Sequence, residues 1–148
     1  MATISGGAAL EERLAEIASK LSRGATLKVG FLEGATYPDG TSVAMVAAIQ
    51  NFGAPSRNIP PRPFFSNMVQ DKSPEWPEAV AKLLVDTDYD VERTLALAGE
   101  AIKGQLQQSI RDTNSPPLSP RTVQRKGFEK PLIDTGHMIN SVDYTVDS

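Results

Sequence analysis

The sequence contains no cysteine and a single histidine, His137. Without cysteine the chain has no disulfide framework, no thiolate chemistry and no cysteine-based zinc site. One histidine likewise excludes a histidine-rich metal site. Positive charge is also scarce, because 15 Lys and Arg against 18 Asp and Glu leave a net charge of −3. A free-standing, non-specific nucleic-acid binder usually carries a basic surface, so this class of protein is disfavoured.

Long apolar runs are missing as well. No apolar stretch approaches about 18 residues, and the first residues lack the charged and apolar regions of a signal peptide. We therefore expect a soluble protein, made in the cytoplasm, with no membrane contact. The length of 148 residues fits one domain, 1–148, that is large enough for its own core.

Apolar residues recur at helical spacing in several places. Leu10, Leu14, Ile17 and Leu21 predict an amphipathic helix over about 8–22, which ends at Gly24 and covers a sheet. Shorter helices are expected over 43–52, from 64 onward and over 76–86, and the longest near 90–112. The expected N-caps are Thr41 or Ser42 for the second helix and Asp88 or Asp90 for the longest. Inside the longest helix, Gly99 and Gly104 are interpreted as points of close packing.

Two stretches alternate between apolar and polar residues, as half-buried strands do. The first lies near 26–33 and the second near 141–147. Their apolar faces match, so the two strands are expected to pair in one small antiparallel or mixed sheet that the helices cover. The sequence thus predicts an α+β fold. Extended, proline-rich loops are expected at 34–40, 53–63 and 113–131.

The segment Ile59–Phe65, called here the proline arm, carries three prolines in four positions. Proline lacks a backbone donor and restricts the chain, so the arm cannot be helix interior or central strand. We expect Phe64 or Phe65 to hold the arm on its own domain, while Arg62 and the prolines face a neighbouring molecule. Replacing Arg62 by alanine should then impair assembly more than stability.

The triplet Asp134-Thr135-Gly136 matches the short signature of aspartic proteases, in which two such aspartates share a proton. A homodimer would supply the pair. However, only twelve residues follow Gly136, which is too few for the flap and the further strands of such an enzyme. The alternative interpretation is that Asp134 or Thr135 caps a short helix over 137–141. A peptidase remains a remote alternative; we expect no catalytic residue, cofactor or metal.

Two groups of motifs occur together in one order. The first group is Val29-Gly30-Phe31, Tyr37-Pro38-Asp39-Gly40, the stretch 43–54 and the proline arm; the second is the stretch 116–122, Lys126 and the stretch 131–142. This order resembles the tail-completion, or tail-to-head joining, proteins of long-tailed bacteriophages and prophages, often labelled minor tail or virion morphogenesis proteins. The resemblance extends from about residue 27 to 146. The family more often has an acidic residue where Asn51 stands.

The resemblance implies a structural virion protein, made in the host cytoplasm, that forms a ring at the phage neck. It implies a hexamer, with no catalysis and no cofactor. Its partners would be other copies of itself and the head-closure, tail-terminator or tail-tube proteins. Genomic DNA would pass through a lumen that is acidic or neutral, without sequence-specific binding. A tail terminator, a head-closure protein and a minor capsid protein are the alternatives in the same region.

A ring requires a heterologous contact whose rotation closes. Protruding loops that are already ordered suit such contacts, because they lose little entropy on docking. The residues expected at subunit or ring interfaces are Tyr37, Asp39, Arg62, Phe64, Phe65, Arg121, Arg125 and Lys126. The acidic segment 86–92 is expected to pair with the basic segment 121–130 of another subunit. Asp134, Thr135 and Gly136 are expected to define the last helix cap.

Overall fold

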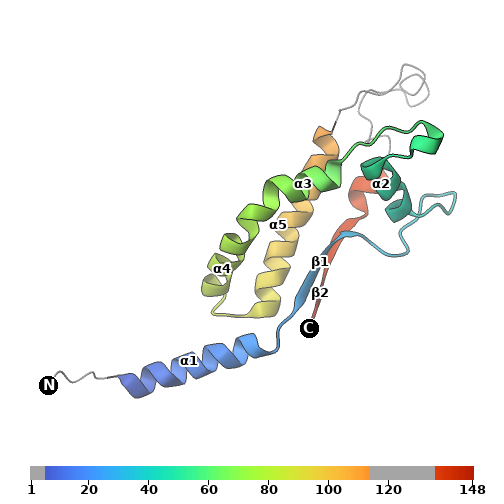
Figure 1. Cartoon of the computed structure of the whole chain (residues 1–148). Coiled ribbons are helices and arrows are strands. Elements are labelled where there is room, and N and C mark those ends of the chain that lie inside the picture. The colour runs from blue at the N-terminus through green and yellow to red at the C-terminus, as the bar shows by residue number, and fades with distance from the viewer. Residues whose placement is uncertain (1–5, 114–135) are drawn as a thin grey trace.

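The computed structural model describes residues 6–113 and 136–148. A long helix, α5 (Val91–Asp112), forms the centre of an α+β fold. A two-stranded sheet lies along one side of α5, while α3 (Phe64–Lys72) and α4 (Trp76–Asp86) run along another (Figure 1). The short 3₁₀ turn Ser73–Glu75 joins α3 to α4.

The sheet confirms the predicted pairing of the two strands. β1 (Thr26–Phe31) runs antiparallel to β2 (Val142–Asp147), with Leu27 opposite Val146 and Phe31 opposite Val142. Of these apolar residues, Leu27, Phe31 and Val142 belong to the same packed cluster as the buried residues of α5. The alternating sequence pattern therefore turns one apolar face toward the long helix and leaves a polar face outside.

Helix α5 begins where Asp90 accepts a hydrogen bond from the backbone N–H of Arg93, at 3.1 Å. One face of the helix is buried at helical spacing and includes Ile102, Leu106 and Ile110. These side chains meet Phe64 and Val142 in the main apolar cluster. The predicted long helix and one of its two predicted caps are thus confirmed.

The two glycines of α5 differ in their surroundings. A Cβ atom on Gly99 would lie 2.6 Å from the ring of Tyr144, so this glycine does allow close packing against β2. The same interpretation of Gly104 is wrong for the part of the chain that the structure describes, where no atom lies within 4 Å of its Cβ position. Gly104 instead lines an open groove of about 690 Å³ between α3 and α5.

Helix α2 (Val43–Phe52) confirms both of its predicted ends. The Ser42 hydroxyl accepts a hydrogen bond from the backbone N–H of Met45, and Gly53 ends the helix with a φ of 75°. Helix α7 (Gly136–Asn140) leads directly into β2. Both α2 and α7 lie at the end of the molecule opposite to α1 (Figure 1).

Helix α1 (Gly7–Ser22) forms as predicted but does not cover the sheet, which corrects that expectation. None of its residues is buried, and Figure 1 shows it projecting from the body beyond β1. The apolar face of the sheet is already taken by α5. The outer face presents polar side chains such as Lys28, Asp143 and Thr145, which give the leucines of α1 nothing to pack on. The chain leaves α1 through Gly24, whose φ is +59°.

Candidate functional site

The proline arm lies firmly on its own subunit. The Arg62 N–H donates to the Gln50 carbonyl of α2 at 2.7 Å. Phe64 is 0% exposed, and its ring meets the edge of the Phe31 ring with 6.1 Å between centroids. Phe65 is half-buried. The prediction that a phenylalanine holds the arm on its own domain is therefore confirmed for Phe64, whereas the expectation that Phe64 lies at a subunit interface is wrong, because none of it is exposed.

Gly53 allows the arm to cross the end of α2. A Cβ atom at this position would lie 2.8 Å from the Pro61 nitrogen and 2.9 Å from the Ile59 carbonyl oxygen. Such distances leave no room for a side chain, and the positive φ of Gly53 also disfavours one. The arm thus needs glycine here both for space and for backbone conformation.

Asn51 joins α2 to α3 and was not predicted as a functional residue. Its side-chain oxygen accepts from the backbone N–H groups of Phe65 and Ser66, each at 3.0 Å, and its amide donates to the Ser66 hydroxyl at 2.8 Å. Pro63, the residue directly before α3, makes no capping hydrogen bond with its side chain. Asn51 therefore caps α3 from another helix. The signal in the sequence is limited to two adjacent amides, Gln50 and Asn51, in a helix whose other residues are apolar.

Arg62 is largely covered within its own subunit, which leaves little of the side chain for the neighbour that was expected to meet it. The residue is only 6% exposed, and burial lowers the pKa of its guanidinium group. The hydrogen bond from its backbone N–H to the Gln50 carbonyl fixes the backbone of Arg62 against α2. Because truncation would remove buried atoms, Arg62→Ala is now expected to lower the stability of the subunit itself.

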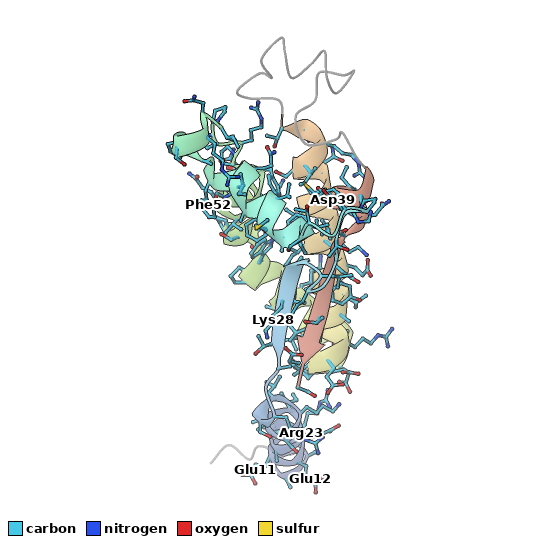
Figure 2. All side chains as sticks on the ribbon, turned by 90° about the vertical axis from the view of Figure 1, so that its right-hand side faces the viewer. Glu11, Glu12, Arg23, Lys28, Asp39 and Phe52 are labelled. Carbon is cyan, nitrogen blue, oxygen red and sulfur yellow. The ribbon has the colours of Figure 1, made fainter. Side chains whose placement is uncertain are left out.

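The loop from 34 to 40 is ordered by its own hydrogen bonds. The Tyr37 N–H donates to the Thr41 carbonyl at 2.9 Å, and the Asp39 carboxylate accepts from the Thr41 N–H at 2.9 Å. The latter bond holds the pKa of Asp39 below its usual value. The Tyr37 ring packs against His137 of α7, 5.4 Å between centroids. Asp39 remains exposed at the surface (Figure 2), so it is available to a partner.

Several predicted site residues lie outside the described residues. These are Arg121, Arg125 and Lys126 of the basic segment, together with Asp134 and Thr135. Of the loop expected at 113–131, only Thr113 is described. Neither the helix cap nor the peptidase alternative at Asp134 is therefore tested, although Gly136 does begin α7.

A cluster of charges connects α1 to the corner between α4 and α5. Asp88 accepts hydrogen bonds from Arg13 and from Lys20, the latter at 3.0 Å. Arg13 also lies over the ring of Tyr89, 5.8 Å from its centroid, and pairs with Glu16 at 3.0 Å. The hydrogen bonds from Arg13 and then Lys20 lower the pKa of Asp88. Asp88 of the acidic segment 86–92 thus pairs with two cations of its own subunit, while the expected pairing with the basic segment 121–130 lies outside the described residues.

Two apolar surfaces remain exposed, one at each end of the molecule. On α1, Leu10 is 59% exposed and Leu14 is 56% exposed. On α2, Phe52 is 73% exposed and Met45 is 53% exposed. Figure 2 shows Phe52 near one end and Glu11 of α1 at the other. Exposed apolar surface of this kind is typical of sites that contact another molecule.

The described residues offer surfaces for association. Among residues 6–113 and 136–148, no three histidine, cysteine or acidic side chains are grouped as metal ligands would be. In the same part of the chain, no helix combines the length and the apolar character needed to cross a membrane. No family model, curated protein or solved structure matches this chain.

Proposed function

We propose that this chain is a structural subunit of the neck of a long-tailed bacteriophage, where copies form a hexameric ring that completes the tail and joins it to the head. The observation that carries the proposal is helix α1. It is amphipathic, it projects from the body, and none of its residues is buried in the subunit. An amphipathic helix outside its own core is suited to burying its apolar face against another molecule.

Two ordered segments support the same function. The proline arm and the loop around Asp39 are both held by hydrogen bonds within the subunit, so contacts made through them would cost little ordering entropy. Of the motifs that resemble those of tail-completion proteins, three fall on these two segments and on α2. The net charge of −3 agrees with a lumen through which DNA slides without being held.

The proposal is tested by reconstituting the neck. Heads and tails are prepared from a phage whose gene for this chain is disrupted, and the purified full chain is added back. We expect separate heads and tails without the chain, and joined particles that contain it after addition. A cryo-EM reconstruction of those particles should place the chain in a ring between the head-closure protein and the tail tube.

Two results would refute this function: normal joined virions in the disrupted phage, or purified virions that lack the chain. A ring found at another level of the neck would assign the chain to the tail terminator, the head-closure ring or the capsid. The reconstruction therefore separates the proposed function from each of its alternatives.

A further inference from the structure

We infer that α1 of one copy docks onto α2 of a second copy of this chain. The docking element is the leucine stripe of α1, defined as Leu10, Leu14, Ile17 and Leu21. The receiving surface is the outer face of α2, defined as Met45, Ala48, Ile49 and Phe52. The inference rests on the proposed function, because a ring requires a heterologous contact, but it is tested by an independent measurement.

Helix α1 is held in place while its leucine stripe stays free. Arg13 and Lys20, seven residues apart, bind Asp88 at the corner between α4 and α5. On a helix with 3.6 residues per turn, Leu10, Leu14 and Leu21 lie to one side of these two cations. The ion pairs therefore orient α1 without covering the stripe, and the leucines remain exposed.

The outer face of α2 brings two large exposed apolar side chains together on one helix. Met45 and Phe52 are two turns apart on one side of a single helix, and the small side chain of Ala48 between them lets another helix approach. The other large exposed apolar side chains, Leu32, Val85 and Leu97, come from separate elements. Isolated apolar residues of that kind are normal on protein surfaces.

The position of the two surfaces requires a second copy. The leucine stripe and the outer face of α2 lie at opposite ends of the molecule, so α1 cannot reach its own α2 (Figures 1 and 2). A contact between different surfaces of identical subunits is heterologous, and repeating it builds a ring when the rotation closes. The two ends of one subunit thus provide the two halves of the contact.

Charge favours α2 over a second α1 as the occupant. Helix α2 contains no charged residue, and the nearest charged residues on either side of it in the sequence are Asp39 and Arg57, both exposed. Glu11 and Glu12 lie beside and opposite the leucine stripe of α1. Neither glutamate has an ion pair within the described part of the chain. Two α1 helices packed together would bring their glutamates close, whereas the residues of α2 carry no charge that would repel them.

The absence of cysteine makes a cross-linking test direct. Leu14→Cys and Phe52→Cys are made separately in the full chain, mixed, and treated with a short bis-maleimide. Lys28→Cys, on the polar outer face of β1, is the matched control for an exposed cysteine elsewhere. We expect a cross-linked dimer from the mixture of L14C and F52C, and a ladder of multimers from the double variant L14C/F52C.

Three results would overturn the inference. The first is cross-linking of L14C to itself without F52C. The second is cross-linking between L14C and F52C that is no stronger than between L14C and K28C. The third is the absence of any cross-link because the chain stays monomeric at every concentration.

A second pair of variants tests the contact without cross-linking. Leu14→Glu places a charge in the leucine stripe, whereas Ala15→Glu places the same charge at an exposed position outside the stripe, about 100° around the same helix. Sedimentation velocity should show roughly tenfold or greater weakening of self-association for L14E and little change for A15E. Equal behaviour of L14E and A15E would contradict the inference.

The two proposals fail separately. If joined virions contain the chain but L14C and F52C do not cross-link within them, the docking inference is wrong and the neck function stands. If the cross-link forms but virions lack the chain, the neck function is wrong and the docking contact stands.

Discussion

Asn51 shows how one side chain connects two helices. Its side-chain oxygen accepts hydrogen bonds from the backbone N–H groups of Phe65 and Ser66. These two groups have no acceptor within the first turn of α3. Because the residue is buried, water does not replace these bonds when the side chain is changed. The proline arm ends at this same place, so Asn51 also fixes where the arm stops and α3 starts.

Replacing Asn51 by leucine should lower the free energy of unfolding by about 2 kcal/mol or more, since it leaves buried donors unpaired. Asn51→Asp should keep most of the stability at neutral pH. A carboxylate accepts the same two N–H bonds, and its charge is favourable at the start of α3. Urea unfolding of the three proteins measures the difference. A leucine variant as stable as the aspartate variant would contradict this role.

At the scale of elements, α5 organises the molecule by presenting different faces to the sheet and to α3 and α4. Gly99 faces β2 at a distance where the ring of Tyr144 fills the space of a side chain. Gly104, on the same helix, faces an open groove. The same residue type thus serves close packing at one position and leaves space at the other.

The two glycines give a matched pair of substitutions with opposite expected signs. Gly99→Ala should destabilise by about 1–3 kcal/mol through overpacking against Tyr144, partly offset by the better helix propensity of alanine. Gly104→Ala should stabilise by about 0.5–1 kcal/mol, because the added methyl group meets no atom of residues 6–113 or 136–148. Thermal or urea unfolding of both variants checks this, and shifts of the same sign and size would refute the assignment.

Local patterns in the sequence predict most elements but not their neighbours. Ser42, Asp90 and Gly53 mark helix ends through their own backbone preferences, which act within a few residues and are visible in the sequence. Amphipathicity says that the leucines of α1 suit an apolar contact, but not which molecule provides it. The close packing predicted at Gly104 was wrong for the same reason, because the sequence does not show which residues surround a glycine in the fold.

Arg62 illustrates the limit for single residues. Arginine is rarely buried, so an exposed, partner-facing role was the reasonable expectation from its type alone. Its burial depends on the path of the proline arm over α2, and that path is set by Gly53 and Gln50 rather than by any pattern around Arg62.

At the scale of the whole molecule, α1 is attached to the body chiefly through charged side chains. Asp88 lies in a left-handed backbone conformation, with a φ of 54°, and meets Arg13 and Lys20 there. All three side chains are substantially exposed. Exposed ion pairs are weak and are screened by salt, so the orientation of α1 should respond to solution conditions.

Asp88→Asn should loosen α1 while leaving α5 unchanged. Hydrogen exchange of the peptide 7–22 is expected to accelerate in D88N, because an isolated helix of this length is marginal in water. Asp86→Asn is the matched control, since Asp86 is an exposed neighbour with no ion pair to α1 within the described residues. High salt should move the wild type toward D88N. Equal exchange in D86N and D88N would contradict the attachment.

The same cluster predicts the direction of a pH effect. The hydrogen bonds from Arg13 and Lys20 of α1 hold the pKa of Asp88 below its ordinary value of about 4. Asp88 therefore contributes to the attachment of α1 to its own subunit at a pH above the ordinary pKa. This contribution is lost as the pH falls through the lowered pKa. Energy transfer between dyes on cysteines introduced at Ala15 and Glu92 should report the release in acid, and D88N should show little of this change.

The pairing of β1 with β2 also has a consequence in time. Most of the described chain lies between these two strands, and β2 with α7 contributes Met138, Ile139 and Val142 to the core. During synthesis on the ribosome, β1 has no partner strand and the side of α5 that contacts β2 stays exposed until residues 142–147 have emerged. A subunit whose synthesis stops before that point has no closed core, and therefore no finished surface to offer to an assembling particle.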